Sequence, residues 1–95
     1  MAKAYLQITL NMDKKGQESA ADVYNKYKAP FLNTIKGALS KELLVRDEGV
    51  QVLHGFETAG DAQEYLLSAL FNKDIVEALK PWLRNGPDIR IYSVV

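Results

Sequence analysis

Hydrophobic side chains recur along this chain with two different spacings, and the order of those spacings constrains the fold most. Residues 4–12 alternate strictly between apolar side chains and polar or aromatic ones. The apolar positions are Leu6, Ile8, Leu10 and Met12. Alternation with a period of two indicates a β-strand that buries one face. The sequence therefore predicts a strand over residues 4–12.

A helical spacing follows this strand. Apolar residues recur at helical intervals between Ala20 and Ile35, and Ser19 is a candidate N-cap. Pro30 interrupts the pattern, because a proline inside a helix removes a backbone hydrogen bond and clashes with the preceding turn. We expect a kink or a restart of the helix at Pro30, and an end of the helical stretch at Gly37.

The middle of the chain returns to strand patterns. Residues 40–46 and 50–57 predict two strands, and the short segment Asp47-Glu48-Gly49 between them is a candidate tight turn. In the second of these strands, Val52, His54 and Phe56 share one face by alternation. The sequence therefore predicts a β-hairpin.

A second helical region and a last strand complete the pattern. Helical spacing begins after Asp61, which is a candidate N-cap, and a further cap at Asp74 predicts that this region is split into two helices. The segment Asn85-Gly86-Pro87 ends the helical region. Residues 88–94 alternate again, and they predict a final strand.

The predicted order of elements is β-α-β-β-α-β, the split β-α-β arrangement of ferredoxin-like folds. Right-handed crossovers then give an antiparallel sheet with the spatial order 4-1-3-2, covered on one face by both helical regions. The chain has 95 residues, which is room for one domain. We therefore expect a single α+β domain over residues 1–95.

The two faces of this sheet are predicted to differ. The face under the helices is expected to be apolar and to carry Leu6, Ile8, Leu10, Leu43, Val45, Leu53, Ile89 and Ile91. The opposite face is expected to be mixed and to carry Gln7, Thr9, Asn11, Glu42, Leu44, Arg46, Val52, His54, Phe56, Arg90, Tyr92 and Val94. A contiguous exposed apolar patch marks an interaction surface, and a two-fold dimer places such a patch against itself. We expect a homodimer through this face; the alternative is a face open to water.

Composition excludes several other classes of protein. The formal net charge is zero, whereas proteins that bind nucleic acids or anionic membranes usually carry a basic excess. The chain has no cysteine, so disulfides, thiolate metal sites and thiol nucleophiles are excluded. Neither a signal-peptide pattern nor an apolar run of membrane-helix length is present. We therefore expect a cytoplasmic protein with neither nucleic acid nor membrane as its partner.

His54 is the only histidine and the natural candidate for a general base, because its unperturbed pKa lies near neutrality. The alternative is a strand histidine that forms a hydrogen bond at an interface. A single histidine, with no paired-acid spacing elsewhere, predicts that the chain has no metal site.

Polar side chains on the last strand suggest a second part of a site. Arg90 and Tyr92 share a face, and they could form a cluster with Gln7 and Asn11 of the neighbouring first strand. An arginine suits a carboxylate or enolate oxygen. The alternative is an interface network that includes Glu42 or Glu57.

The first helix carries an aromatic stripe formed by Tyr24, Tyr27 and Phe31. Most such stripes belong to the hydrophobic core. If a pocket lies between the helix and the sheet, these three side chains would line it.

The layout of the whole chain resembles the dimeric α+β barrel superfamily, and within it the antibiotic-biosynthesis-monooxygenase-like group. The resemblance rests on the strand Tyr5–Met12, the segment Tyr24–Gly37 leading into Ser40–Arg46, the hairpin end Val52-Leu53-His54-Gly55-Phe56 and the closing strand Ile89–Val94. It implies two sheets paired across a dimer, with a small ligand held between sheet and helices. Oxygenases of this group carry an asparagine on the first strand, which Asn11 matches.

Two functions remain open, because fold alone does not choose between them. The first is a small-molecule-binding protein, a cofactor-free monooxygenase or isomerase of an aromatic or enolisable compound. In that case His54 would move the proton, and Arg90 and Asn11 would hold the oxyanion. The ligand-binding residues would be Gln7, Tyr92, Tyr24, Tyr27 and Phe31. The second is a non-enzymatic homodimeric module whose mixed face is only an interface.

Overall fold

The computed structural model of this chain describes residues 2–72, 80 and 87–95. The elements are β1 (Ala4–Asn11), α1 (Lys14–Thr34), β2 (Ala38–Arg46), β3 (Gly49–Phe56), α2 (Ala59–Leu66) and β4 (Asp88–Ser93). This is the predicted β-α-β-β-α-β order. The predicted split of the second helical region at Asp74 lies outside the described residues.

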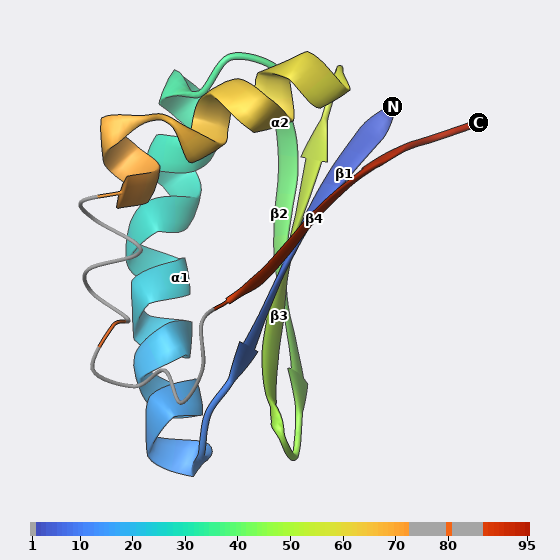
Figure 1. Cartoon of the computed structure of the whole chain (residues 1–95). Coiled ribbons are helices and arrows are strands. Elements are labelled where there is room, and N and C mark those ends of the chain that lie inside the picture. The colour runs from blue at the N-terminus through green and yellow to red at the C-terminus, as the bar shows by residue number, and fades with distance from the viewer. Residues whose placement is uncertain (1, 73–79, 81–86) are drawn as a thin grey trace.

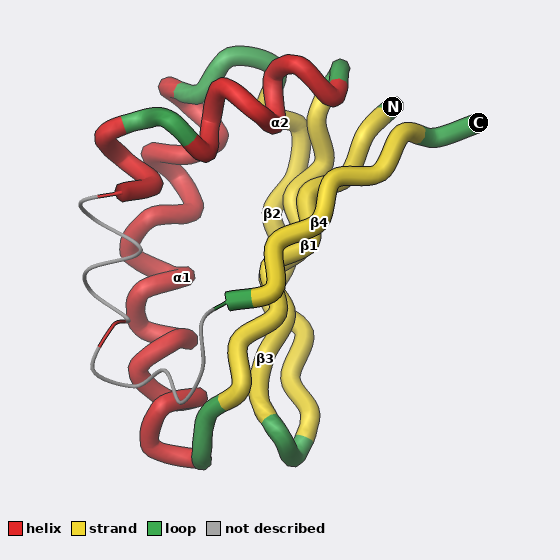
Figure 2. Tube along the Cα trace, in the orientation of Figure 1, coloured by secondary structure: helices red, strands yellow, loops and turns green. Residues whose placement is uncertain are grey.

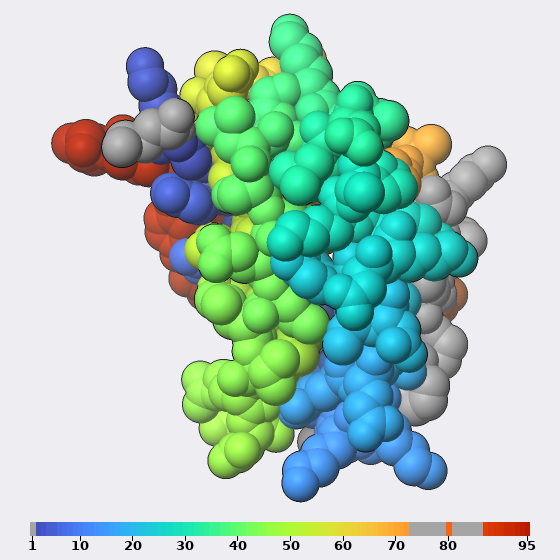
Figure 3. Space-filling view, turned by 180° about the vertical axis from the view of Figure 1, so that it is seen from behind, coloured from blue at the N-terminus to red at the C-terminus, as the bar shows by residue number. Residues whose placement is uncertain are grey.

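The four strands form one antiparallel sheet in the order β2-β3-β1-β4. This is the predicted order 4-1-3-2, read from the other edge. Helices α1 and α2 lie on the same side of the sheet (Figure 1). Figure 2 shows the strands as one twisted layer beside them, as the right-handed twist of strands requires. Seen from behind, α1 lies beside β2, and the end of the β2–β3 hairpin forms a corner of the molecule (Figure 3).

Both helices begin earlier than the sequence pattern suggested. Asp13 is the N-cap of α1, and its carboxylate accepts a hydrogen bond of 2.9 Å from the N–H of Gly16. Ser19, the predicted cap, lies inside the helix. Thr58 caps α2 in the same way, since its hydroxyl oxygen accepts a hydrogen bond of 3.1 Å from the N–H of Asp61. Each cap satisfies a backbone donor that the first turn of a helix leaves unpaired.

Pro30 lies inside α1 and does not end it, so the helix does not restart there, which was one of the two outcomes that the sequence suggested. The helix continues to Thr34, whose hydroxyl donates a hydrogen bond of 2.6 Å to the carbonyl oxygen of Pro30. The next residue after the proline, Phe31, is completely buried. Its burial offsets the backbone hydrogen bond that a proline cannot donate.

The register of the strands decides which side chains share a face. Opposite residues of β1 and β3 include Leu6 with His54, Ile8 with Val52, and Ala4 with Phe56. Residues directly opposite in an antiparallel pair lie on the same face. Val52, His54 and Phe56 therefore lie under the helices with the buried face of β1. The sequence-based assignment placed them on the opposite face, and it was wrong.

The hairpin turn explains this correction. The strands pair so that Arg46 lies opposite Gly49 and Val45 opposite Val50, which aligns odd-numbered residues of β2 with even-numbered residues of β3. The prediction had aligned Leu53 with Val45. A shift of one residue moves every side chain of a strand to the other face. Leu53 accordingly lies opposite Gln7, on the face that no described helix covers.

The hydrophobic core fills the space between the sheet and the helices. Its buried members are Ala4, Leu6, Ile8, Leu10, Met12, Ala20, Phe31, Val50, Phe56, Ala62, Tyr65 and Phe71. Each large apolar side chain of this set stabilises the fold by about 1.5–3 kcal/mol relative to an exposed one. None of the helices in the described part of the chain combines the length and the apolarity needed to cross a membrane.

Candidate functional site

Three polar side chains lie inside the apolar layer between sheet and helices. Lys41 of β2, His54 of β3 and Tyr65 of α2 are only 3%, 1% and 1% exposed. Phe31 of α1 lies among them. These four residues, here called the buried cluster, come from four different elements, so only the folded chain brings them together.

The ring of Phe31 is the centre of the buried cluster. Its centroid lies 5.1 Å from the His54 ring centroid and 4.9 Å from that of Tyr65, and both contacts are edge-to-face. The Lys41 ammonium nitrogen lies 5.2 Å from the same centroid, which is a cation–π contact. The His54 and Tyr65 rings are 5.4 Å apart, and Lys41 lies opposite His54 across the two strands.

His54 is held as a neutral imidazole. Its Nδ1 lies 3.2 Å from the carbonyl oxygen of Leu6. A carbonyl only accepts hydrogen bonds, so Nδ1 carries the proton and Nε2 has the lone pair. Burial and the nearby charge of Lys41 lower the pKa of His54 from 6.5 to about 3, against the opposing effect of the hydrogen bond to Leu6.

Lys41 is a lysine in a position suited to an aliphatic residue. Burial lowers its pKa from 10.5 to about 8, because the charged form loses its hydration. Within residues 2–72, 80 and 87–95 the ion pairs are Arg46 with Glu48 and Arg90 with Asp88, and neither includes Lys41. A fraction of this lysine is therefore a neutral amine near neutral pH.

Tyr65 completes the cluster from α2. Its hydroxyl oxygen is fully buried and has no hydrogen-bond partner among the described residues. Burial raises the pKa of this phenol, so it stays protonated at neutral pH. An unpaired buried hydroxyl costs about 1–3 kcal/mol, so each such group calls for an explanation.

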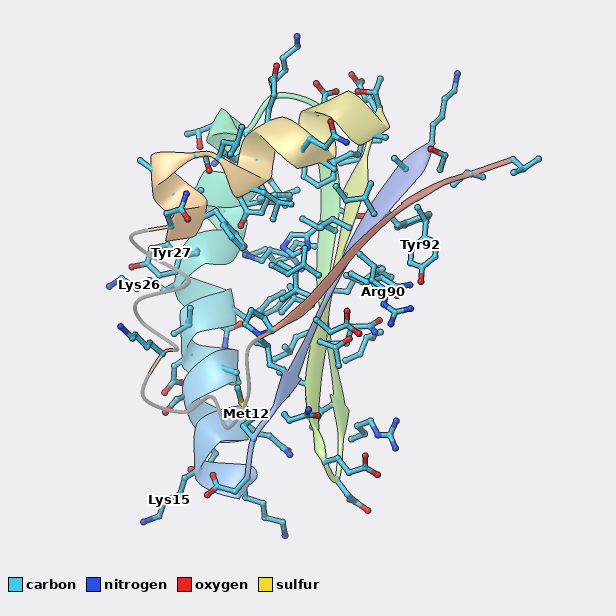
Figure 4. The ribbon with its side chains drawn as sticks, in the orientation of Figure 1. Met12, Lys15, Lys26, Tyr27, Arg90 and Tyr92 are labelled. Atoms are coloured by element: carbon cyan, nitrogen blue, oxygen red, sulfur yellow. The ribbon has the colours of Figure 1, made fainter. Side chains whose placement is uncertain are left out.

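The other predicted catalytic residues lie on the opposite face of the sheet. Figure 4 shows Arg90 and Tyr92 pointing away from the helices, whereas Met12 lies on the helix side. Arg90 lies opposite Gln7, but its Nε donates hydrogen bonds of 3.1 and 3.2 Å to the carboxylate oxygens of Asp88.

The sheet therefore separates the residues that the sequence had grouped into one site. His54 is directed into the helix layer, while Asn11 and Arg90 are exposed on the uncovered face. One chain cannot bring all three to the same substrate atom. The physical reason is the register of β3, which turns His54 inward.

The aromatic stripe of α1 also divides. Phe31 belongs to the buried cluster, and the Tyr24 hydroxyl donates a hydrogen bond of 2.8 Å to the backbone oxygen of Lys41. Tyr27 lies on the side of α1 away from the sheet, with the Lys26 ammonium 5.2 Å from its ring centroid (Figure 4). Two of the three predicted ligand residues of this helix are therefore at or beside the cluster.

Sequence reasoning missed Lys41 and Tyr65. Tyr65 falls within the second predicted helical region, and its helical spacing gave no further signal. Lys41 did carry a signal, because it alternates in register with Leu43 and Val45, which the sequence predicted to lie under the helices. A charged residue at a core position of a strand is unusual, since lysine is almost never fully buried without a partner.

The described residues line one surface hollow at the hairpin end of the sheet and another beside Tyr65. One of about 240 Å³ lies at the hairpin end of the sheet, between Asn11, Leu44 and Arg46. The other, about 170 Å³, lies between Thr34 and α2 and reaches Tyr65. The described residues contain no group of three or more His, Cys, Asp or Glu side chains that could hold a metal ion.

Solved structures share this arrangement of sheet and helices. A monooxygenase of Streptomyces coelicolor, determined with the ligand nanaomycin D, is 15% identical, covers 99% of this chain and 88% of its own, and superposes with a TM-score of 0.81. A candidate antibiotic biosynthesis monooxygenase from Caulobacter crescentus is 18% identical, over 99% and 91% of the two chains, with a TM-score of 0.81. This chain has the fold of the antibiotic-biosynthesis-monooxygenase-like proteins.

The same fold occurs in a protein of unknown function from Nitrosomonas europaea, which is 18% identical over 100% of this chain and 91% of its own, with a TM-score of 0.80. No family model and no curated protein matches the sequence. At these low sequence identities the similarity shows only that the fold is shared. The chemistry must be argued from this chain's own side chains.

Proposed function

We propose that this protein binds a small aromatic or enolisable compound between its sheet and its helices, and that it acts on it as a cofactor-free monooxygenase or isomerase. The observation that carries the proposal is the buried cluster. Polar groups in an apolar core cost stability unless they are satisfied, and here Tyr65 has no partner among the described residues. A ligand in this layer would supply partners for such groups, and one protein of the same fold is known with nanaomycin D as its ligand.

In this proposal His54 binds the ligand and does not act as the general base. Its pKa of about 3 makes it a weak base, whereas an efficient general base has a pKa near the working pH. In this proposal the lone pair on Nε2 accepts a hydrogen bond from the ligand and orients it, and Phe31 packs against the aromatic ring. Arg90 and Asn11, on the other face of the sheet, are left out of the catalytic group.

The oxygenase reaction needs no group that this chain lacks. An activated methylene reacts with dioxygen according to CH₂ + O₂ → C=O + H₂O, in which the substrate supplies the electrons and dioxygen is the oxidant. The protein has to deprotonate the substrate, hold the anion and exclude water. For an isomerase, the same anion would be reprotonated at another carbon.

Oxidation of dithranol, an aromatic compound with such a methylene, tests this proposal. We expect the protein to raise oxygen consumption and quinone formation above the uncatalysed rate. The substitution Tyr65→Phe removes only the hydroxyl and should lower this rate by roughly ten- to a hundredfold. Tyr5→Phe, on the uncovered face, is the matched control and should leave it unchanged. A wild-type rate equal to the uncatalysed one, or equal rates for both variants, would contradict the proposal.

The partner in this proposal is a second copy of the chain, bound through the uncovered face of the sheet. Leu44 and Tyr92 on this face are each 45% exposed, and Val94 beyond the end of β4 is 52% exposed. Tyr5 and Leu53 add half-buried apolar surface beside them. Such a patch also favours the alternative function, a non-enzymatic homodimeric module, which would need no ligand in the buried cluster.

A further inference from the structure

Among the residues of the buried cluster, Lys41 lowers the stability of the fold most, because its burial removes a charge from water. The fold does not require a charged side chain at this position. Lys41 shares a face of β2 with Leu43, which packs against the hydrophobic core, and it is only 3% exposed. An aliphatic side chain would fill this position without desolvating a charge. A lysine at this position therefore indicates a use for an amine in the layer between sheet and helices.

No described group that faces Lys41 neutralises its charge. Phe31 of α1 offers only the face of its ring. Tyr24 of α1 donates to the backbone oxygen of Lys41, and Tyr65 of α2 is a protonated phenol. His54 of β3 is a neutral imidazole whose Nδ1 is bound to Leu6. Ring contacts replace only part of the hydration that a buried ammonium loses, so the site is short of negative charge.

The same surroundings allow the amine of Lys41 to gain or lose a proton near neutral pH. Burial lowers the pKa of Lys41 to about 8, so both the amine and the ammonium are populated near neutral pH. The Tyr65 ring packs edge-to-face on the Phe31 ring, with 4.9 Å between the centroids. Its hydroxyl is buried, has no partner among the described residues and can donate a hydrogen bond. A base, a donor and an aromatic surface therefore lie together.

We propose that Lys41 takes the proton of an acidic phenol or enol bound beside Phe31 and then holds the resulting oxyanion as its counter-ion. The O–H bond of the substrate breaks, and its electron pair stays on oxygen. The proton forms a new N–H bond on Nζ, which changes from a neutral amine to an ammonium. Tyr65 donates a hydrogen bond to the oxyanion. This inference rests on the proposed function, because it names the substrate class of the same site.

Binding of para-nitrophenol tests this assignment, because its phenolate absorbs visible light and the neutral phenol does not. At pH 6 the free compound is mostly neutral and Lys41 is almost entirely an ammonium, so the wild-type protein should bind the compound as a phenolate paired with this ammonium, with the absorbance of the phenolate. Lys41→Met should abolish that absorbance and weaken binding on the order of tenfold or more. Lys41→Arg keeps a charge that cannot deprotonate, so it should bind the phenolate preferentially as pH rises. Tyr65→Phe should weaken binding by roughly two- to tenfold.

Two controls separate this inference from the proposed function. Lys26 also lies over an aromatic ring, at 5.2 Å from its centroid, but it is exposed, so Lys26→Met should change nothing. The neutral ether para-nitroanisole should bind equally to the wild type and to Lys41→Met. If the ether binds but the phenol shows no ionisation that depends on Lys41, this inference is wrong and the proposed function stands. If neither compound binds to the wild type, both are wrong.

Discussion

At Lys41 the chain carries a charge where its own fold would be more stable without one. At pH 7 the lysine is mostly protonated in the folded protein and fully protonated in the unfolded one, but only in the folded state has the charge lost its hydration. With the pKa lowered from 10.5 to about 8, and roughly 1.4 kcal/mol for each unit, this loss is about 3 kcal/mol. Part of it is offset by the contact with Phe31. Functional sites typically contain polar groups that lower the stability of the fold.

We therefore predict that Lys41→Met raises the free energy of unfolding at pH 7 by about 2–3 kcal/mol. The wild type should also become more stable as pH rises from about 8 towards 10.5, because the unfolded chain binds the proton that the folded chain has released. Lys41→Met should lack this rise. Urea denaturation at pH 7, 8 and 9 measures both effects, at pH values where unfolded tyrosines are still mostly protonated.

Lys26→Met is the matched control for this measurement and should change the unfolding free energy by less than about 0.5 kcal/mol. If Lys41→Met instead destabilises the protein at pH 7, Lys41 has a partner that compensates its charge. The residue would then be structural, and the argument that it awaits an anion would fail.

At the level of elements, the β2–β3 hairpin and its pairing with β1 determine which residues form the site. Gly49 begins β3 opposite Asn11 and Arg46. A Cβ atom at this position would collide with the backbone oxygen of Leu10. A glycine here lets the two backbones approach closely and keeps the register that turns His54 inward.

Gly49→Ala should accordingly destabilise the protein by about 2 kcal/mol or more, because the neighbouring atom belongs to the backbone and cannot move aside. Gly60→Ala is a matched control inside α2, where the nearest atom to a Cβ would be the Thr58 hydroxyl oxygen at 3.7 Å. That variant should be neutral or more stable by about 0.5–1 kcal/mol, as alanine favours a helix. Thermal melting of the two variants gives the comparison, and equal stabilities would show that the close contact at Gly49 is unimportant.

At the scale of the whole molecule, the two faces of the sheet have different surroundings. The helix side holds the core and the buried cluster, and the other face presents apolar side chains to solvent in the single chain. An interface between two copies through this face would bury Leu44 and Tyr92, and a stable interface usually buries about 800 Å² on each partner. The sheet would then separate the hydrophobic core on one face from the dimer interface on the other.

We predict that the wild type sediments as a dimer in analytical ultracentrifugation and that Leu44→Glu sediments as a monomer, because it places a charge in the apolar patch. Leu67→Glu is the matched control, since Leu67 is 83% exposed at the end of α2, on the helix side of the sheet. It should remain a dimer. A monomeric wild type, or a dimeric Leu44→Glu variant, would rule out an interface at this face.

The sequence by itself determined the strands, the two helical regions and the sheet order, since alternation and helical spacing are local properties and crossover handedness prunes the alternatives. It also identified His54 and Phe31 as residues of interest. It misjudged the starts of both helices, because Asp13 caps α1 and Thr58 caps α2 through hydrogen bonds to residues three positions further on.

Only the tertiary structure decided which face of β3 is buried. Alternation defines two faces of a strand, but both faces of β3 contain apolar residues, so the choice between them depends on pairing with β1 and β2. That pairing moved His54 away from Arg90 and Asn11 and placed it beside Lys41, Phe31 and Tyr65. These contacts join residues that are far apart in the chain, and local sequence patterns do not predict such contacts.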